Sequence, residues 1–546
     1  MTTQSLRAAR RLRSGLIFGR FTPGEVSAFL FVVAGVLFVV ALVALSYSWV
    51  LASSGQTATG TVGAKPASAA SGGSSASHAT HSSAVVPSRP DVAAPSSDTS
   101  AVASGPSGAT QSAPAVASST PAVAPADPAV AMVVPGGEAM KYWSRWRGPS
   151  GQGVVEGNNY PDTWSDTANV IWKIKVPGRG HSSPIVWADR IFLTTADADC
   201  TKRSVLCFQR SDGKLLWQTA VPDVVAEKLY AKNSYASASV STDGQRVYAY
   251  FGSAGLAAFD FSGKLVWHAP LGTISLYHGP GGSPLLYKDR LILYQDQRMM
   301  DRSVATPPGF IVAIDKATGR ELWRQNRDPQ PGWGTPIAIT VGDRTEIIVS
   351  GSRRISAYDP GTGKVFWSCT GNTVEVVPTP VVALGMVFAC SGRAGPTIAV
   401  RPGGSGDVTA THVAWSTPKG SSFVPSPLVV GDYLYTINDM ASVVSSHNAR
   451  TGELIGQLRL GEPQREGFSA SPVAVGGKIF FTNDEGDTFA LSPAPDFKLL
   501  HVNRLGERTL ASPALVDGRW YFRTQDHLIC IGAGAKPLVI PRINRD

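Results

Sequence analysis

One short pattern recurs along this chain and restricts its fold more than any other feature of the sequence. In residues 313–323 an apolar segment runs into an Asp/Thr-Gly turn, and a second apolar segment follows and ends in tryptophan. Similar segments cover residues 207–217, 258–267 and 357–367. Self-similarity of this kind is typical of repeat architectures, in which each copy supplies one unit of the fold. The pattern therefore predicts a protein built from repeated pairs of β-strands.

A second pattern marks where each repeat begins. A small residue and a proline are followed by alternating apolar residues, a polar turn and another apolar segment, so that each copy predicts four short strands. The second copy lacks the proline. The eight copies start at Ser183, Ser239, Ser283, Thr335, Thr379, Ser426, Ser471 and Ser512.

A four-stranded antiparallel unit of this length cannot bury both of its faces alone, whereas units stacked around an axis bury them against their neighbours. Eight copies therefore predict an all-β, eight-bladed β-propeller of four-stranded antiparallel blades over residues 139–546. The eighth copy lacks a clear fourth strand. Residues 170–176 form a strand-like segment before the first copy, and we expect this N-terminal strand to complete the eighth blade and close the ring.

Tryptophans occupy the same position in six of the predicted blades. A tryptophan there is expected to bury a large area between neighbouring blades while its indole N–H donates to a carbonyl. Gly456 and His501 stand at this position in blades six and seven, so those two interfaces are expected to be weaker. The six blade tryptophans are Trp172, Trp217, Trp267, Trp323, Trp367 and Trp415.

The N-terminal part of the chain has a different character. Residues 1–25 are basic, and residues 26–45 form a charge-free apolar run that is long enough to cross a bilayer as a single-pass transmembrane signal-anchor helix. The basic flank is expected to stay in the cytoplasm, which places the propeller on the extracytoplasmic (periplasmic) side. Cleavage of the run as a signal peptide, at residues 50–52, is the alternative.

Residues 52–138 consist mostly of Ala, Ser, Pro, Thr, Val and Gly, with almost no large hydrophobic side chains. Such a segment cannot bury enough apolar surface to offset the entropy that it would lose on ordering. We therefore expect a disordered linker here. Order is expected to begin near Tyr142, with residues 143–151 packing irregularly against the edge of the propeller.

Charge and cysteine content narrow the choice of partners. The formal net charge is +9, but the basic residues come singly in the repeat region, which disfavours nucleic acid as a partner.

None of the five cysteines forms a CxxC pair, which argues against a zinc site. Cys200 and Cys207 flank one predicted hairpin and are able to pair in an oxidising compartment. The alternative is that all five cysteines are buried as small apolar residues.

The patterns AxDxxTGKxxW and SPxVxxxxxxF together resemble the propeller repeat of pyrroloquinoline-quinone (PQQ) proteins, over residues 143–534. The motif WxRWRGPxGxG and the stretches NVIWKIKVPGRGHSSPIV and GFSASPVAV resemble a bacterial family of PQQ-binding-like β-propeller repeat proteins, akin to the outer-membrane assembly lipoprotein BamB. The wider superfamily includes quinoprotein alcohol and glucose dehydrogenases as well as non-enzymatic scaffolds. The fold therefore does not decide the function.

The resemblance implies particular residues for a dehydrogenase: two adjacent cysteines, a tryptophan beneath the quinone, Ca²⁺ held by a carboxylate and an amide, and an Asp that acts as the base. The chain has no adjacent cysteine pair. The acidic stretch 483–487 lies at a predicted hairpin and lacks the ligand spacing of a calcium loop. We therefore expect no catalytic residue, no metal site and no cofactor. A PQQ- and calcium-dependent dehydrogenase of alcohols or sugars is the alternative.

Binding residues are expected where the connections enter the innermost strands, because these loops gather around the propeller axis on a rigid scaffold. We predict that this channel mouth binds a peptide strand, a glycan or a small polar ligand. The predicted protein is a monomeric, non-enzymatic binding or scaffold module, with a protein or glycan partner in cell-envelope or outer-membrane protein assembly. The candidate residues are Arg179, His181, Tyr235, His278, Trp333, Glu375, Phe468 and Arg508.

Overall fold

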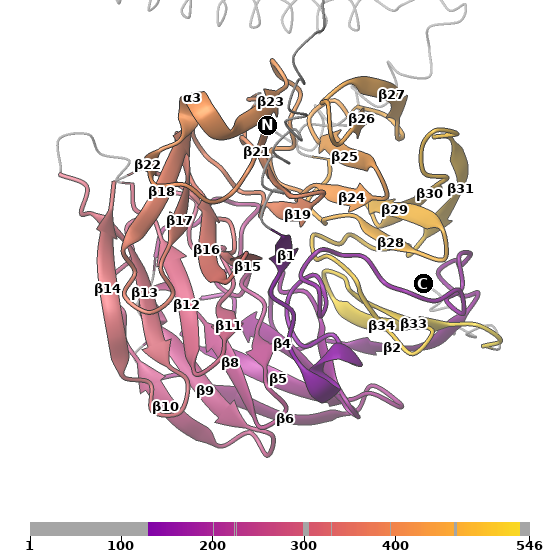
Figure 1. Cartoon of the computed structure of the whole chain (residues 1–546). Helices are drawn as coiled ribbons and strands as arrows, with labels where there is room; N and C mark the ends of the chain where they lie inside the picture. The colour runs from indigo at the N-terminus through magenta and orange to yellow at the C-terminus, as the bar shows by residue number, and fades with distance from the viewer. Residues whose placement is uncertain are drawn as a thin grey trace, which may run out of the picture. The chain divides into compact units, whose positions relative to one another are not determined.

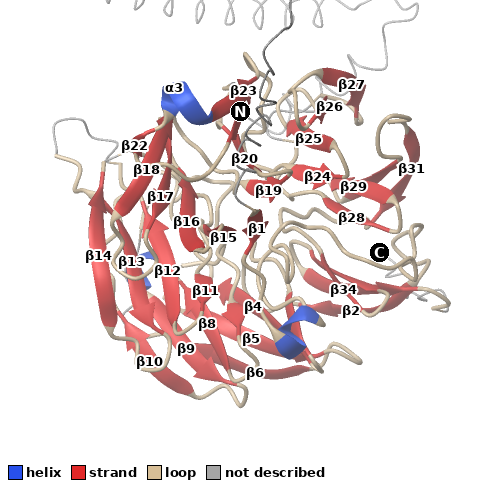
Figure 2. Cartoon of the chain, viewed as in Figure 1, coloured by secondary structure: helices blue, strands red, loops and turns tan. Residues whose placement is uncertain are grey.

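Eight antiparallel sheets stand around a common axis in this chain, as Figures 1 and 2 show. The computed structural model describes residues 129–535 except 200, 223, 225–226, 299–304, 329, 394 and 464–466. Each sheet is a blade of four strands, and one blade gains two further short strands. The first strands of neighbouring blades contact one another around the axis. The prediction of an all-β, eight-bladed propeller is confirmed.

The strands follow the chain from the inner to the outer edge of each blade. The first four blades contain β3 (Ile185–Trp187), β4 (Arg190–Ala196), β5 (Arg203–Gln209) and β6 (Leu215–Ala220); β7 (Ser241–Thr242), β8 (Arg246–Tyr250), β9 (Leu256–Asp260) and β10 (Leu265–Ala269); β11 (Leu285–Tyr287), β12 (Arg290–Gln295), β13 (Gly309–Asp315) and β14 (Glu321–Arg327); and β15 (Ile337–Val341), β16 (Arg344–Ser350), β17 (Arg354–Tyr358) and β18 (Val365–Thr370). The other four contain β19 (Val381–Ala383), β20 (Met386–Cys390), β21 (Thr397–Val400) and β23 (Val413–Ser416); β24 (Leu428–Val430), β25 (Tyr433–Asn438), β26 (Val443–Asn448) and β27 (Leu454–Arg459); β28 (Val473–Val475), β29 (Lys478–Thr482), β30 (Asp487–Leu491) and β31 (Leu499–Arg504); and β32 (Ala514–Val516), β33 (Arg519–Arg523), β34 (His527–Gly532) and β2 (Val170–Lys175).

Burial along each blade follows from the stacking. The middle strands β4 and β5 are buried at nearly every position, whereas the outermost strand β6 alternates between exposed and half-buried residues. A strand covered on both faces reads as a continuous apolar run, and a half-covered strand alternates. The apolar core is therefore divided into clusters that lie between neighbouring blades, such as the one that joins blades two and three.

The ring is closed by strands from opposite ends of the propeller sequence. Strand β2 pairs antiparallel with β34, with Trp172 opposite Cys530. This is the closure that the incomplete eighth repeat predicts. The closure completes the eighth blade, so the strand edge of β34 is paired. An unpaired strand edge is where strands fray.

The blade tryptophans join each blade to the next. Trp217 lies opposite Cys207 in its own blade, and its indole N–H donates to the carbonyl of Phe261 in the following blade at 3.0 Å. Gly263 has a positive φ of 90°, and a Cβ there would stand 2.6 Å from the Trp217 ring, so the turn requires glycine. The same indole-to-carbonyl contact is made by Trp172, Trp267, Trp323 and Trp415.

Trp367 departs from this pattern. Its indole N–H donates to the buried carboxylate of Glu346 in its own blade at 2.8 Å. The fifth blade lacks the Asp/Thr-Gly turn that would accept this N–H, because β22 (Gly406–Asp407) and helix α3 (Thr409–His412) replace it. A charged acceptor therefore takes the place of the missing carbonyl.

The two blades without a tryptophan are filled in another way. Phe497, from the connection before β31, is 8 % exposed and lies 3.2 Å from where a Cβ of Gly456 would stand. In the next blade the His501 ring contacts the carbonyl of Asp162 at 2.6 Å. Trp164 stacks on Phe480 and packs on Trp520, which bridges blades seven and eight. Residues outside the repeat pattern therefore occupy the space at both interfaces, and the expectation that these interfaces are weaker stays a prediction.

Order begins earlier than the composition predicts. Strand β1 (Val130–Met132) lies within the stretch assigned to the linker, and it pairs antiparallel with β15, the innermost strand of blade four. A short 3-10 helix, η1 (Gly137–Met140), follows it. The low hydrophobicity of this stretch suggested disorder, but pairing with an existing strand edge satisfies its backbone without a large apolar surface.

The segment that follows, residues 143–155, runs inside the central channel and is called the axial segment below. The Trp143 carbonyl accepts from Val186 N–H of blade one at 3.0 Å, and the Gly153 carbonyl accepts from Ala474 N–H of blade seven at 2.8 Å. Arg147 donates to the Pro427 carbonyl of blade six at 2.7 Å. The expectation that this segment packs against the edge of the propeller is wrong, because it lies against the inner strands. The inner strands carry an unpaired edge toward the axis, and this segment fills it.

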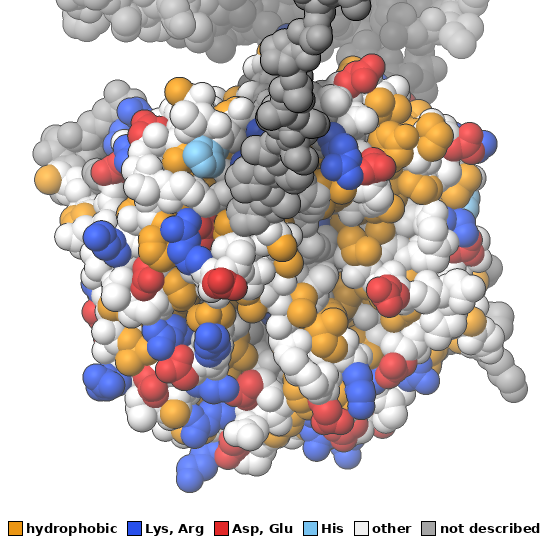
Figure 3. Space-filling model, in the orientation of Figure 1, with side chains coloured by type: hydrophobic (Ala, Val, Ile, Leu, Met, Phe, Trp, Pro, Cys, Tyr) orange, Lys and Arg blue, Asp and Glu red, His pale blue; other side chains and the backbone are white. Residues whose placement is uncertain are grey.

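Several expectations concern residues that the structure does not describe. The predicted transmembrane helix 26–45 and most of the linker lie outside the described residues, and no helix within the described part is long and apolar enough to cross a membrane. Cys200 is also outside them, whereas Cys207, Cys369, Cys390 and Cys530 are buried with free thiols. On the face drawn in Figure 3, basic and acidic side chains are interspersed, in line with the scattered charges of the sequence.

The filled interface between blades six and seven predicts the effect of a single substitution. Replacing Phe497 by alanine should lower the free energy of unfolding by about 3 kcal/mol, because a buried aromatic ring is lost beside a glycine that cannot fill the space. Leu500, which is 41 % exposed in the same blade, is the control and should cost less than about 1 kcal/mol when replaced by alanine. Urea unfolding followed by tryptophan fluorescence measures both, and equal effects would show that Phe497 does not replace the missing tryptophan.

Candidate functional site

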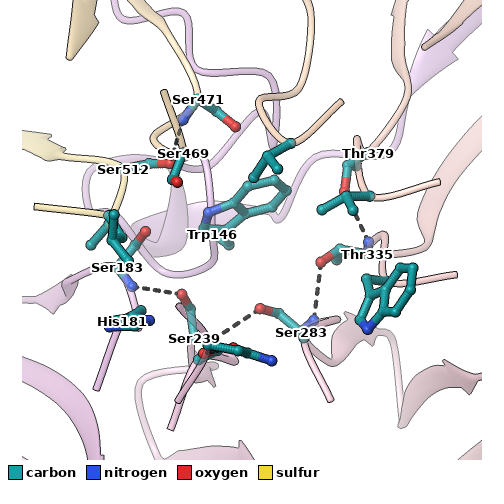
Figure 4. Close-up of a pocket in the computed structure, with 18 of the residues that line it drawn as sticks. Trp146, His181, Ser183, Ser239, Ser283, Thr335, Thr379, Ser469, Ser471 and Ser512 are labelled. Carbon is teal, nitrogen blue, oxygen red and sulfur yellow. Dashed lines mark hydrogen bonds between the residues drawn. The ribbon is translucent and has the colours of Figure 1, made fainter. Parts of the chain in front are cut away.

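The small residue at the start of each repeat contributes to a ring of hydroxyl groups around the axis. The Ser183 N–H donates to the Ser239 hydroxyl at 2.9 Å, and the Ser239 N–H donates to the Ser283 hydroxyl at 3.0 Å. The contact repeats at 2.9 to 3.0 Å from Ser283 to Thr335, Thr335 to Thr379, Thr379 to Ser426, Ser426 to Ser471 and Ser471 to Ser512. Seven consecutive hydrogen bonds thus join all eight blades at their inner ends, and Figure 4 shows several of them.

A cavity of about 230 Å³ lies above this ring, and we call it the mouth cavity. Trp146 of the axial segment lies among the hydroxyl-bearing residues, as Figure 4 shows. The axial segment therefore supplies part of the wall of the cavity that the inner strands surround. The other aromatic side chains of the lining come from loops, namely Tyr230, His278, Trp333 and Phe423.

The aromatic side of the mouth cavity is a packed cluster. His278 and Trp333 stack with ring centroids 5.5 Å apart and an interplanar angle of 24°. The ring centroid of Tyr230 lies 4.9 Å from that of His278. The Trp333 indole N–H donates to the Gly279 carbonyl at 2.7 Å, which fixes the orientation of the ring. A rigid aromatic wall of this kind binds flat or apolar groups with little loss of side-chain entropy.

His181 stands between the mouth cavity and a second cavity next to it. Burial, together with the positive charges of Arg523, Lys232 and Arg508, lowers the pKa of His181 to about 3. The imidazole is therefore neutral at neutral pH and offers one donor and one acceptor.

The second cavity, called the seam cavity, has a volume of about 730 Å³ between blades eight and one. The predicted residues Arg179, Tyr235 and Arg508 line it, together with His181. Arg179 is held in place by backbone hydrogen bonds with Ala196 in both directions. Four of the eight predicted residues thus meet here.

Two other predicted residues line neither cavity. Glu375 accepts a hydrogen bond from the Tyr277 hydroxyl and forms an ion pair with Arg393 at 3.2 Å. It therefore braces the loop behind His278. Phe468 is 1 % exposed and packs on Phe489 in the core, so its aromatic ring is not available at the mouth. His278 and Trp333 complete the set, at the mouth cavity.

A strap across the mouth is a feature that sequence reasoning missed. The long connection between β6 and β7 carries Lys232, whose ammonium lies 2.7 Å from the carboxylate of Asp484 in blade seven. The base of the strap is held by a buried ion pair between Arg203 and Glu227 at 3.2 Å. The unusual length of this connection was the available signal, because loops of this length in compact domains are uncommon.

Comparison with known proteins agrees with this architecture. A family model described as "Outer membrane protein assembly factor BamB" matches residues 162–301, 307–439 and 440–532, which is more than half of the chain. The chain belongs to this family.

Solved structures share the fold of this BamB-family protein at low sequence identity. The quinohemoprotein alcohol dehydrogenase from Comamonas testosteroni is 11% identical with a TM-score of 0.52, and ADHIIG from Pseudomonas putida HK5 is 11% identical with a TM-score of 0.54. Both matches cover 73% of this chain and 82% of the other. BamB from Moraxella catarrhalis is 16% identical with a TM-score of 0.49, over 67% of this chain and 98% of the other. No curated protein sequence matches the chain.

Two buried carboxylates of this BamB-family propeller have raised pKa values and lie beside loops of the mouth. Asp439 directly follows the second strand of blade six, Asp484 lies two residues after the second strand of blade seven, and both are nearly inaccessible to solvent. Burial raises the pKa of Asp439 to about 6 and raises the pKa of Asp484 as well. One Asp439 oxygen accepts from Phe423 N–H at 2.9 Å, and the other has no hydrogen-bond partner among the described residues.

The side chains that could bind a metal ion do not come together in the described residues. No group of three or more His, Cys, Asp and Glu within the described residues is arranged to hold a metal ion. The stretch 483–487 is the hairpin between β29 and β30, as the sequence predicts. Its Asp484 is committed to Lys232 and to the Ser469 hydroxyl at 3.3 Å.

The raised pKa of Asp439 predicts that this carboxylate destabilises the folded protein at high pH, so that removing its charge stabilises the protein there. The folded state binds more protons than the unfolded chain between pH about 4 and 6, so wild-type stability should fall as the pH rises through that window. Asp439→Asn keeps the acceptor for Phe423 N–H and removes the charge. The variant should be more stable than the wild type by roughly 1–3 kcal/mol at pH 8 and not below pH 4.

Urea unfolding of both proteins at a series of pH values measures this difference. The exposed Asp432→Asn in the same blade is the control, because solvent screens its charge. A gain for Asp439→Asn that is the same at pH 4 and pH 8 would show that charge is not its cause.

Proposed function

We propose that this protein is a non-enzymatic binding or scaffold module of the cell envelope, acting in outer-membrane or other envelope protein assembly. The observation that carries the proposal is the mouth cavity: a rigid aromatic wall and a ring of hydroxyl groups, in a channel that the chain's own axial segment fills. Membership in the BamB family supports a role in protein binding and assembly. The ligand is a peptide strand, with a glycan as the second class that aromatic and hydroxyl groups suit.

The location follows from the N-terminal sequence. The apolar run at 26–45 behind a basic flank is proposed to anchor the protein in the membrane by one helix, with the propeller on the periplasmic side. Residues 52–128 then act as a linker that lets the propeller reach partners away from the membrane. In this arrangement the protein works as a monomer that is tethered and not embedded.

A quinone-dependent dehydrogenase is the second candidate, and the fold of the quinohemoprotein dehydrogenases favours it. The residues of this chain do not suit that cofactor. Adjacent cysteines are missing from the sequence, and Asp484 of the acidic stretch 483–487 is paired with Lys232. We therefore propose that neither PQQ nor Ca²⁺ is required.

Reconstitution tests the two candidates against each other. The full-length protein incubated with PQQ and Ca²⁺ should take up no quinone by absorbance after desalting, and should not support dye-linked oxidation of alcohols or sugars. We expect no uptake because the chain lacks the residues that would hold the quinone. Stoichiometric uptake with turnover would replace the scaffold proposal by the dehydrogenase.

Loss of the mouth tests the scaffold proposal directly. We expect the triple variant His181→Ala, His278→Ala and Trp333→Ala to capture at least about tenfold less of an envelope ligand than the wild type. The reason is that three side chains that line the mouth cavity are removed. Pull-down from envelope extracts, quantified by mass spectrometry against the wild type, measures it. Circular dichroism checks the fold, and the half-buried pair His181→Ala and His278→Ala serves if the triple variant unfolds.

The matched control is Arg320→Gln with Arg450→Gln, which changes two exposed turns at the opposite end of the blades. This control should capture the same ligand as the wild type. Capture that survives the mouth variant would place the binding surface elsewhere and end the proposal for this cavity.

A further inference from the structure

The seam cavity holds a buried positive charge that the protein does not neutralise. Arg523, at the end of β33, is 1 % exposed and lines this cavity. Its Nη1 donates to the Ser182 hydroxyl at 3.1 Å and to the Thr194 carbonyl. Both acceptors are uncharged, and Nε and Nη2 have no hydrogen-bond partner among the described residues. Burying a guanidinium with unused donors is costly, so a site of this kind is suited to an anion.

The backbone over Arg523 is shaped to leave the guanidinium in place. A Cβ at residue 180 would stand 2.6 Å from Nη2 and 2.8 Å from Nη1 of Arg523. Gly180 therefore lets the chain pass directly over the guanidinium, and it also lines the cavity. A side chain at 180 would therefore displace Arg523.

Other cations surround the same cavity. Arg179 and Arg508 lie exposed at its rim, and Lys232 lines it from the strap. The effect of Arg523, Lys232 and Arg508 on the pKa of His181 shows that their fields meet at this place.

Carboxylates are present too, but two of them line the cavity against four Arg and Lys side chains. Asp197 and Asp526 line the cavity. Asp197 accepts from the Thr201 hydroxyl and from Lys202 N–H, both at 2.7 Å, within its own turn. Asp484 and Glu485 lie on the neighbouring hairpin, the first paired with Lys232 and the second 3.9 Å from Arg508. The lining therefore keeps an excess of positive charge.

We propose that the seam cavity binds a carboxylate of a protein ligand, with Arg523 as its buried anchor and Arg179 and Arg508 at its rim. The proposal rests on the proposed function, since it takes a peptide as the occupant of the mouth. The two cavities share His181, Tyr230 and Asn233, so one extended peptide reaches both. An aromatic or apolar side chain then lies against Trp333, and an acidic side chain or terminal carboxylate meets the guanidinium, which pairs well with carboxylates.

Selection of random peptides displayed on phage against the full-length protein tests this specificity. Enriched peptides should carry Asp or Glu at a fixed distance from an aromatic or large apolar residue. A synthetic peptide of that sequence should lose about tenfold in affinity when its acidic residue is replaced by the matching amide, because a charge-assisted contact is lost. Isothermal titration calorimetry measures both peptides.

Variants then locate the charge. Arg179→Gln with Arg508→Gln should weaken binding of the acidic peptide about fivefold and leave the amide peptide unchanged. Arg320→Gln with Arg450→Gln removes the same charge at the opposite end of the blades and should change neither. Arg523→Met replaces a buried cation by an apolar chain of similar length, which folds are able to tolerate, and should abolish the preference for the acidic peptide.

The outcomes separate this proposal from the one on which it rests. Selected peptides that compete for the mouth but bind equally well as acid and amide would overturn the carboxylate site and leave the scaffold function intact. Failure to select any peptide would remove peptide binding at the mouth and this site with it. The carboxylate site would also be overturned if both double variants weakened binding of the acidic peptide equally. It would likewise be overturned if inorganic phosphate stabilised the protein while the selected peptides carried no acidic residue.

Discussion

The inner edge of each blade is the constraint on which the rest of this propeller depends. An innermost strand pairs on one side only, and its other side presents backbone groups to the axis. The ring of Ser and Thr hydroxyl groups accepts one N–H from each neighbouring blade. The axial segment satisfies further groups from within the channel. The hydroxyl ring and the axial segment both satisfy backbone groups at the inner edges of the blades. The same residues therefore hold the blades together and line the mouth cavity.

The outer part of the ring depends on a different contact. An indole ring lies over the turn of the next blade and donates to its carbonyl, and the glycine of the turn makes room for it. Phe497 and Trp164 fill the two places where the repeat has no tryptophan. Trp367 keeps the position but changes its acceptor. What the interface requires is therefore volume and a satisfied N–H, and neither has to come from the repeated position.

The sequence was sufficient for the fold because strand, turn and tryptophan recur together, and because a ring of eight needs the strand at 170–176. It was sufficient for part of the site, since blade topology alone brings the loops of His181, His278 and Trp333 to one end. Phe468 was misplaced because the direction of a loop side chain is not fixed by strand register. The axial segment was misplaced because its partners come from many blades and leave no periodic trace. The contact of Lys232 with Asp484 joins distant blades, and no local pattern indicates it.

The closure of the ring by β2 and β34 has a consequence for how the molecule is made. The N-terminal strand of blade eight, β2, is made before the other seven blades and has to wait for β34, so seven blades are made before the ring is complete. During that interval the inner edges around the axial segment are exposed to wrong pairings, which is the usual hazard of large β-folds with distant contacts. Once the last strand docks, first-made and last-made residues become neighbours. The finished ring then has no terminal blade at which unfolding could begin.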